Sequence, residues 1–451
     1  MVSVGDTLPL TIDKPAAGGR MIARANGLVV LVSGAIPGER VRARIERVGK
    51  GVAYAAAVDI EEPSADRRAP AGDPLCGGCL YAHIAYPHQL ELKARVIADA
   101  FTRIGRMDLP AIVHVAPSPE EGYRMRARLH VRGRVVGFFR EGTHEVCDAR
   151  QTRQLLPATS DALDRLVAAM HSLGPAGDPA IHEIELAENV DASNRVVYLD
   201  VSPPGVPGVP AVNIARSLER LAATDGLTGL ASRGAVHGDA HVTDAITIDG
   251  HPPVALRRHV LAFFQGNRYL VSQLIAHVTA QVPSGSDVVD LYAGVGAFAI
   301  TSAAVRRARV MAVEGDRIAA MDLTANAAVT NGAVVAVHQS VEEFLGGAVR
   351  SGAVRSVRLP WPERQRRQPD RDQLAPTLIV DPPRTGISRE ALDGICRLGA
   401  PRIVYVSCDV ATLARDARCL VDSGYALTQV DAFDLFPNTP HVETVIVFQK
   451  S

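Results

Sequence analysis

The feature that most constrains the fold is a regular alternation of short apolar runs and helix-like stretches, which extends from about Arg257 to the C-terminus. This alternation predicts a parallel, doubly wound α/β sheet. Open sheets of this type bind their ligands at the carboxyl ends of the strands. The residues that directly follow each expected strand are therefore the first candidates for a functional site.

The first of these strands lies in SDVVDLYAGVGAFAI, where an apolar run ends in a glycine turn and a helix follows. Gly294 and Gly296 lack the side chains that would block a cofactor from approaching the backbone. The next expected strand, in ARVMAVEGD, ends at Glu314, which is placed to accept hydrogen bonds from both ribose hydroxyls of a nucleoside. A dinucleotide site also uses a glycine turn; here position 299 of the Gly-x-Gly-x-x-Gly pattern is Ala, which that third position tolerates, so the dinucleotide site stays an alternative. The arrangement favours S-adenosylmethionine.

A further strand, in LIVDPPRTGIS, ends in Asp381 and two prolines. Prolines fix φ and donate no hydrogen bond, so this turn should be rigid. Many nucleic-acid methyltransferases hold an extruded base at an Asp-Pro-Pro or Asn-Pro-Pro turn. Those that methylate exocyclic amines usually have an aromatic residue next, whereas this chain has Arg384.

A fourth strand, in RIVYVSCDVATLARD, delivers Cys408 to the same edge of the sheet. A cysteine buried in a core does not need that placement, whereas one that must meet a ligand does. Cytosine-5 enzymes carry their nucleophile in a Pro-Cys pair, which occurs nowhere in this chain. Another target atom is therefore indicated.

Residues 1–62 form short apolar and alternating runs separated by turns, a pattern typical of a small β-barrel. Basic residues recur along this stretch, most densely in VRARIERVGK. Small barrels with a basic face often bind oligonucleotides, and a solvated barrel surface is the alternative. Residues 63–255 should form a linker, a cysteine-containing segment and a central β-rich domain, with a weak pattern over residues 155–250.

The central region contains a regular stripe of basic residues in the segment GYRMRARLHVRGRVVGFF. Its members all have even numbers: Arg124, Arg126, Arg128, His130, Arg132 and Arg134. Alternate residues of a strand share one face, so an extended segment would display them together. Such a stripe suits phosphates, with an exposed sheet face as the alternative. A bend at Gly133 would remove Arg134 from the stripe.

Composition limits the classes of partner. The net charge of −1 excludes a chain that is basic all over, but not one with local basic faces. No apolar run approaches the roughly 18 residues of a membrane span, and the first residues do not resemble a signal peptide, so we expect no membrane partner. Six cysteines in 451 residues do not make a disulfide framework, which indicates a reducing cytoplasm. Residues 346–376 are polar and arginine-rich, and predict a surface insertion.

Six motifs occur in the order found in the S-adenosylmethionine-dependent RNA 5-methyluridine methyltransferases: FFQGNRYL, DLYAGVGAF, AVEGD, DPPRTG, YVSCDVATLARD and HVETV. The N-terminal barrel resembles the TRAM domain of many members, and CGGCLYAHIAYPHQLELK is similar to the segment that follows that domain. The resemblance covers nearly the whole chain and is weakest at 155–250 and 346–376. It implies a Rossmann-like class I methyltransferase domain over 256–451, S-adenosyl-L-methionine as cofactor, and methylation of carbon 5 of a specific uridine.

The resemblance also implies roles for individual residues. Cys408 would be the nucleophile that adds to carbon 6 of uracil, and Glu443 of HVETV would remove the carbon-5 proton. The positions implied to contact the cofactor are Gln265, Tyr292, Glu314 and Asp381. Phe263 would stack on the extruded base or pack in the core, and Asn326 would line the pocket. His441 is a neighbour of the site without an assigned role.

This chain departs from the family pattern beside the nucleophile. Many relatives have Ser-Cys-Asn-Pro where this chain has Ser-Cys-Asp-Val. The carboxylate of Asp409 would raise the pKa of the Cys408 thiol unless it points away.

A second departure concerns metal. Several relatives bind an iron–sulfur cluster through four cysteines, of which Cys76 and Cys79 match two. Pro70 and Thr152 stand at or near the other two positions, and Cys147 is out of register. We therefore predict neither an iron–sulfur cluster nor another metal site. A zinc set that combines these two cysteines with His83 and His88 is an alternative, although the loop is shorter than in ordinary zinc fingers.

The expected partner is RNA, with ribosomal RNA favoured over transfer RNA, and the expected state is a monomer. The competing interpretation is a non-catalytic RNA-binding or folding factor on the same scaffold. The presence of both Cys408 and Glu443 speaks against that alternative.

Overall fold

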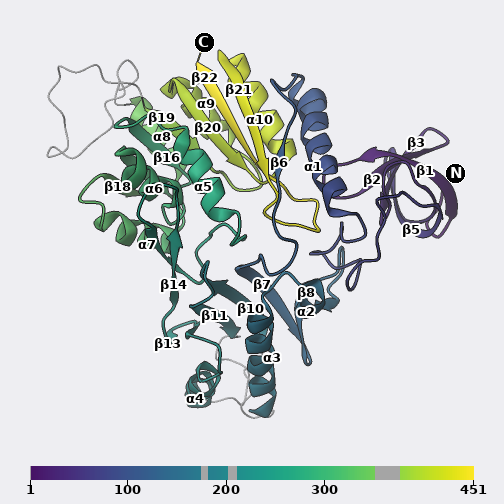
Figure 1. Ribbon diagram of the computed structural model, residues 1–451, viewed down its shortest axis with the longest axis horizontal. Helices are drawn as coiled ribbons and strands as arrows, with labels where there is room; N and C mark the ends of the chain where they lie inside the picture. The colour runs from purple at the N-terminus through teal and green to yellow at the C-terminus, as the bar shows by residue number, and fades with distance from the viewer. Residues whose placement is uncertain (1, 174–180, 202–210, 351–375, 451) are drawn as a thin grey trace.

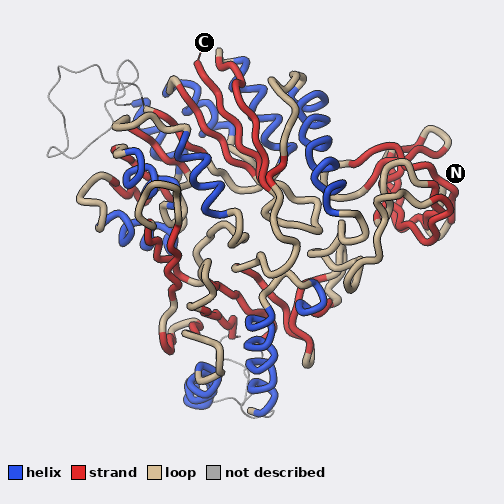
Figure 2. Tube along the Cα trace, in the orientation of Figure 1, coloured by secondary structure: helices blue, strands red, loops and turns tan. Residues whose placement is uncertain are grey.

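A computed structural model describes residues 2–173, 181–201, 211–350 and 376–450. It contains a closed barrel, a seven-stranded central sheet, a two-stranded ribbon and an eight-stranded sheet (Figure 1). The eight-stranded sheet has helices on both faces, and helix α1 stands between it and the barrel (Figure 2).

The N-terminal barrel closes in the order β1-β2-β3-β5-β4. Its strands are β1 (Thr7–Pro15), β2 (Met21–Ala25), β3 (Leu28–Ser33), β4 (Arg40–Gly49) and β5 (Val52–Glu62). Along β4, Val41, Ala43 and Ile45 are buried, and the arginines between them are exposed. The strict alternation of apolar and basic residues therefore places arginines on the outer face, as predicted for a small basic barrel.

Helix α1 (Tyr86–Ala100) continues into the π-helical turn η1 (Phe101–Gly105), and the short strand β6 (Val115–Ala116) follows. Ile97, Ala100 and Phe101 join the same apolar core as Leu413 and Ile446 from the C-terminal part of the chain. We expected a helix after Gln89 to pack there despite preceding that part in sequence, and the structure confirms the placement. The helix begins earlier, at Tyr86, because Pro87 suits a first helical turn.

The central sheet has the order β13-β12-β11-β10-β7-β8-β9. Its strands are β7 (Arg126–Arg132), β8 (Val135–Phe139), β9 (Val146–Asp148), β10 (Ile181–Glu188), β11 (Arg195–Val201), β12 (Gly229–Ser232) and β13 (Ala235–Gly238). The prediction of a β-rich region over 155–250 was incomplete, because helices α3 (Pro157–Ser172) and α4 (Ala211–Ala222) lie within it. Helix α3 buries Leu163, Leu166, Val167 and Met170, a helical spacing that covers the sheet. The Pro/Gly stretch SPPGVPGVP lies outside the described residues.

The large sheet has the order β18-β17-β16-β19-β20-β22-β21-β6. Its main strands are β16 (Asp287–Leu291), β17 (Arg309–Glu314), β18 (Val334–His338), β19 (Thr377–Val380), β20 (Arg402–Ser407), β21 (Tyr425–Phe433) and β22 (Glu443–Lys450). The strands from β16 to β20 are parallel, and β22 runs antiparallel to β20 and β21. This arrangement confirms the doubly wound α/β fold that the alternation predicted, with β22 as the one described strand of this sheet that runs opposite to the others.

Helices and a ribbon complete this part of the chain. The helices are α5 (Val271–Ala280), α6 (Ala297–Arg306), α7 (Arg317–Ala328), α8 (Val341–Arg350), α9 (Arg389–Leu398) and α10 (Val410–Asp422), and the ribbon pairs β14 (His241–Ile246) with β15 (Val254–His259). The expected insertion at 346–376 begins later than predicted, because residues 346–350 continue helix α8. Its remaining residues, 351–375, lie outside the described part of the chain.

Candidate active site

Cys408 and Glu443 come together at the edge of the large sheet. In the antiparallel pairing of β20 with β22, Ser407 lies opposite Thr444. Cys408 directly follows Ser407, and Glu443 directly precedes Thr444. In an antiparallel pair, Cys408 and Glu443 therefore lie opposite each other, one position beyond the Ser407–Thr444 pair. Glu443 also lies opposite Phe433 of β21, and its side chain is buried. Strand pairing therefore sets a thiol and a carboxyl group side by side at the carboxyl end of β20.

The surroundings favour the neutral form of both groups. Burial, and then the carboxyl group of Glu443, raise the pKa of the Cys408 thiol to about 12. Burial, and then Asp381, raise the pKa of Glu443 well above its ordinary value. Arg384 acts against both shifts, because its positive charge favours the anions. The sequence reasoning noted this arginine only as a departure from other methyltransferases and missed its place beside the thiol.

Asp381 links the thiol to the glycine turn. It directly follows β19, and Gln265 Nε2 donates a hydrogen bond to its Oδ2 at 3.4 Å. Burial, and then Glu314, raise the pKa of Asp381 to about 7. The same aspartate acts on Cys408 and on Glu443. The predicted residues Gln265, Asp381, Cys408 and Glu443 therefore form one continuous group of side chains.

The glycine turn follows β16 and leads into α6. Gly294 has a φ of +55°, and a Cβ placed there would meet nothing nearer than the Phe263 carbonyl oxygen at 4.0 Å. Its backbone N–H donates to Glu314 Oε2 at 2.7 Å, and Asp316 N–H donates to Glu314 Oε1 at 2.6 Å. The turn thus leaves open space above the backbone and holds a carboxylate at its rim. These features fit the nucleoside part of S-adenosylmethionine, whose ribose hydroxyls can donate to the remaining lone pairs.

Tyr292 lies apart from the other predicted cofactor residues. Its backbone is left-handed, with a φ of 60°, where β16 enters the glycine turn. Its side chain lines a cavity of about 800 Å³ together with Pro383, Gly386 and Asp416. None of the other five predicted site residues lines this cavity. A tyrosine side chain can point to either side of a strand end, and the motif alone did not show which.

Two further candidates differ in their exposure. Phe263 is 59% exposed, so it does not pack in the core, and Arg126 lies over its ring at 5.9 Å from the centroid. Asn326 is buried, and its amide bonds the backbone of Arg257 and Val295. Its polar atoms therefore join α7 to β15 and the glycine turn, and the prediction that it lines the pocket is not supported.

Asp409 is not among the causes of the raised pKa of the Cys408 thiol. Its Oδ1 accepts a hydrogen bond from the Thr412 N–H at 2.8 Å, which makes it the N-cap of α10. The carboxylate is held by the positive end of that helix, and the shift in the pKa of Cys408 has other causes. His441 is mostly buried, and burial, followed by Arg384, lowers its pKa to about 4.

The part of the basic stripe within β7 lies on one face of the central sheet, as the even spacing predicted, whereas Arg124 precedes that strand and donates to Gln154 Oε1 at 2.6 Å. Arg128 and Arg132 are exposed, whereas Arg126 and His130 are half-buried. The strand ends at Arg132, and Gly133 then turns the chain with a φ of 56°. Two carboxylates of β10 face the stripe, because Arg128 Nε lies 2.6 Å from Glu185 and 3.4 Å from Glu183. The stripe is therefore partly neutralised, which the spacing within one strand could not show.

Three cysteines gather beneath the central sheet. Cys76 and Cys147 are joined by a disulfide with a Cα–Cα distance of 5.9 Å, and Cys79 is buried in the same cluster. The sequence reasoning did not pair Cys147 with this segment. Thr152, near the fourth position of the relatives' cluster, donates its hydroxyl to the Ala149 carbonyl at 2.7 Å. A four-cysteine iron–sulfur cluster does not fit these residues.

The alternative zinc set is not assembled either. His83 Nε2 lies 3.2 Å from the Ala35 carbonyl oxygen, and His88 bonds Glu91 at 3.0 Å. Within the described ranges, no group of three or more His, Cys, Asp or Glu side chains is arranged to hold a metal ion.

Comparison with known proteins identifies the family. Residues 232–451 match the profile of the tRNA (Uracil-5-)-methyltransferase family, and residues 2–58 match the TRAM domain. The 23S rRNA (uracil(1939)-C(5))-methyltransferase RlmD of Alkalilimnicola ehrlichii is 32% identical, over 96% of this chain and 94% of that protein. This chain is a member of the RNA 5-methyluridine methyltransferase family. The family is the one that the six motifs predicted.

Two further proteins are similar over nearly their whole lengths. RlmD of Pseudomonas putida, also a 23S rRNA (uracil(1939)-C(5))-methyltransferase, is 31% identical over 99% of this chain and 95% of that protein. The crystal structure of Pyrococcus abyssi tRNA (uracil-54, C5)-methyltransferase in complex with S-adenosyl-L-homocysteine has a TM-score of 0.70. At 22% identity it covers 97% of this chain and 99% of its own, and shows the shared fold. In the described part of this methyltransferase, no helix has the length and apolar character to cross a membrane.

Proposed function

We propose that this methyltransferase transfers a methyl group from S-adenosyl-L-methionine to carbon 5 of a specific uridine in RNA through a covalent adduct with Cys408. The observation that carries the proposal is the register of β20 and β22, which places Cys408 beside Glu443. A nucleophile and a base at one strand edge are what addition to a pyrimidine ring and removal of its proton require. Membership of the family supports the same reaction.

Each proposed residue has one task. S-adenosylmethionine would supply an electrophilic methyl group, and Glu314 with the open turn at Gly294 would hold its nucleoside. Gln265 and Asp381, whose side chains are hydrogen-bonded to each other, would contact the cofactor as well. Tyr292 shapes the turn through its left-handed backbone.

Carbon 5 of uracil is a weak nucleophile, so the ring must be activated first. The Cys408 thiolate adds to carbon 6, and the electron pair of the carbon–carbon double bond moves into the ring as an enolate. Carbon 5 of the enolate then takes the methyl group, and the methyl carbon–sulfur bond of the donor breaks, which would leave S-adenosyl-L-homocysteine. Glu443 removes the proton from carbon 5, the double bond re-forms, and the thiolate leaves carbon 6. Arg384 favours the anionic forms of Cys408 and Glu443 at the stages that need them.

We propose ribosomal RNA as the substrate, because relatives named as 23S rRNA methyltransferases align over nearly this whole chain at 31% and 32% identity. The exposed arginines of β4 and β7 would contact its phosphates. Phe263 would stack on the extruded uracil, since its ring is exposed.

Deletion of the gene, followed by mapping of 5-methyluridine in total RNA, tests the proposal. We expect one 5-methyluridine to disappear from 23S rRNA, to return with the wild-type gene, and not to return with Cys408→Ala. Unchanged 5-methyluridine in all RNA would overturn the proposed function. Loss from transfer RNA instead would overturn only the substrate assignment.

A further inference from the structure

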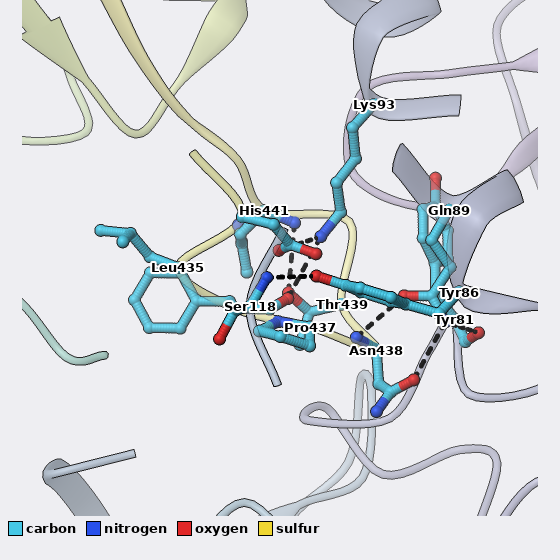
Figure 3. Close-up of polar contacts among 12 residues, drawn as sticks. Tyr81, Tyr86, Gln89, Lys93, Ser118, Leu435, Pro437, Asn438, Thr439 and His441 are labelled. Carbon is cyan, nitrogen blue, oxygen red and sulfur yellow. Dashed lines mark hydrogen bonds and ion pairs between the residues drawn. The ribbon is translucent and has the colours of Figure 1, made fainter. Parts of the chain in front are cut away.

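The loop between β21 and β22 closes directly on the proposed base. It spans residues 434–442 and leads into Glu443, the first residue of β22. Phe433 and Glu443 lie opposite each other across the two strands. Contacts that fix this loop therefore fix the backbone that carries Glu443. Figure 3 shows that side chains from the N-terminal half of the chain converge on it.

Lys93 of α1 makes the most buried of these contacts. Its Nζ lies 2.5 Å from Oδ1 of Asp434, the first residue of the loop, and the two side chains are 1% and 0% exposed. The same ammonium donates to the Phe436 carbonyl at 3.2 Å. Burial lowers the pKa of Lys93, and Asp434 opposes that shift. A buried ion pair rarely stabilises a fold more than apolar packing would, so the pair is better explained by the geometry that it fixes.

Gln89 holds the same loop one helical turn earlier. Its Nε2 donates to Asn438 Oδ1 at 2.9 Å, and the Asn438 N–H donates back to Gln89 Oε1 at 2.9 Å. Asn438 has a φ of 63°, a left-handed conformation that such a pair of bonds can maintain. Residues four apart share one face of a helix, so Gln89 and Lys93 hold the loop from a single face of α1.

Residues outside α1 also contact loop 434–442. The Tyr123 hydroxyl donates to the Pro437 carbonyl at 3.2 Å, and Asn267 Nδ2 donates to the Leu435 carbonyl at 3.1 Å. A turn of the barrel packs on it too, since a Cβ at Gly19 would lie only 2.8 Å from Pro440 Cγ. Arg68 Nη2 also donates to Asn438 Oδ1 at 2.8 Å, so Lys93 is distinguished by its buried ion pair with the first residue of the loop.

We propose that Lys93 is a positioning residue for proton removal. By binding Asp434 and the Phe436 carbonyl, it holds loop 434–442 in the conformation that presents Glu443 to the methylated carbon 5. The linker helix α1 thereby becomes part of the support of the active site. This role rests on the proposed function, because it concerns the step that follows methyl transfer.

The test compares natural and fluorinated RNA in the full-length Lys93→Met protein. A misplaced base should slow only the release step, by about tenfold or more. The variant should therefore transfer one methyl per enzyme to natural RNA and then accumulate a denaturation-resistant adduct that the wild type does not. RNA with 5-fluorouridine offers no removable proton, so both proteins should form its adduct at rates within about twofold of each other.

Two further variants separate positioning from folding. Lys93→Met leaves Asp434 buried without its partner, whereas Lys93→Met with Asp434→Asn removes both charges. The double variant should recover thermal stability and still accumulate adduct on natural RNA. Arg309→Met is the matched control, since it breaks the Arg309–Asp287 pair, with contacts of 2.8 and 2.6 Å, at the amino ends of β17 and β16. This control should not accumulate adduct.

The outcomes distinguish the two proposals. A folded Lys93→Met or double variant that releases natural RNA at the wild-type rate would overturn the positioning role alone. Slower adduct formation on fluorinated RNA together with equally slowed methyl transfer to natural RNA would also overturn it, since that result means a defect in folding or binding. A wild type that forms no adduct on fluorinated RNA would overturn the proposed function, and this role with it.

Discussion

The large sheet and the central sheet present their functional side chains in different ways. In the large sheet, Glu314 ends a strand, while Asp381 and Cys408 come directly after theirs. In the central sheet, the basic residues run along the face of β7, where Glu183 and Glu185 of β10 lie beside them. A site at strand ends depends on local motifs, whereas the charge of a sheet face depends on neighbouring strands. The first can be found in a sequence and the second only in a fold.

The largest effect should come from the proposed base at the strand edge. Glu443→Gln keeps the shape of the side chain but removes the group that takes the proton, so turnover should fall by about 10²- to 10⁴-fold. Adduct should then accumulate on natural RNA after methyl transfer. Steady-state kinetics with denaturing electrophoresis measures both, and the exposed Glu390→Gln on α9 should behave as wild type. Normal turnover of Glu443→Gln would assign the base to another residue.

The next effect concerns the thiol at the same edge. The pKa of Cys408 is raised to about 12, so the reactive thiolate is scarce at neutral pH. Alkylation by iodoacetamide in the absence of RNA should therefore accelerate about tenfold per pH unit between pH 7 and 9. Arg384→Gln should slow it at each pH, because the arginine favours the anion. Peptide mass spectrometry follows the reaction, with the exposed Cys419 as an internal control that should react faster. A rate independent of pH would contradict the raised pKa.

A smaller effect is expected on the face of the central sheet. Arg128→Ala with Arg132→Ala should weaken RNA binding and reduce the salt slope by about one unit for each phosphate that is no longer bound. Glu183→Gln should strengthen binding, because it frees charge on Arg128. Arg150→Ala, whose partners lie on α3, is the control and should leave the slope unchanged. If the double variant kept the wild-type slope, the stripe would not bind phosphate.

We expect no iron to be bound near Cys76, Cys79 and Cys147. Protein purified without oxygen should be colourless and lack stoichiometric iron and acid-labile sulfide, because Thr152 and Pro70 offer no thiolates. Metal analysis and absorbance spectra check this. About four irons per chain would contradict it, and would require Cys147 as a ligand.

Much of the fold and part of the site could be predicted from the sequence. The alternation of apolar runs and helix-like stretches indicated a parallel, doubly wound sheet, and the motifs placed Glu314, Asp381 and Cys408 at one edge because parallel strands end together. Helix α3 was missed although its buried residues Leu163, Leu166, Val167 and Met170 follow a helical spacing. The acids beside the stripe come from β10, more than fifty residues later in the sequence. Cys76 and Cys147 are likewise far apart, at a sequence separation of 71. Such long-range contacts leave no local pattern.

The contacts that hold loop 434–442 before Glu443 are also long-range contacts of this kind. Lys93 and Asp434 are 341 residues apart, and neither belongs to a motif that indicates a partner. A buried lysine within QLELK gives only a weak signal, since lysines in helices are usually exposed. The direction of the Tyr292 side chain likewise depends on packing around the turn, not on the DLYAGVG motif itself.

The central claim is that Cys408 bonds covalently to carbon 6 of a uridine, and an adduct with fluorinated RNA tests it most directly. RNA carrying 5-fluorouridine, incubated with S-adenosylmethionine and the wild-type protein, should give a complex that survives denaturing electrophoresis. Mass spectrometry of the digested complex should find the RNA on the Cys408 peptide, with methyl and fluorine on the same carbon. Cys408→Ala should give no complex. An adduct that persists in Cys408→Ala, or that maps to another residue, would contradict the account.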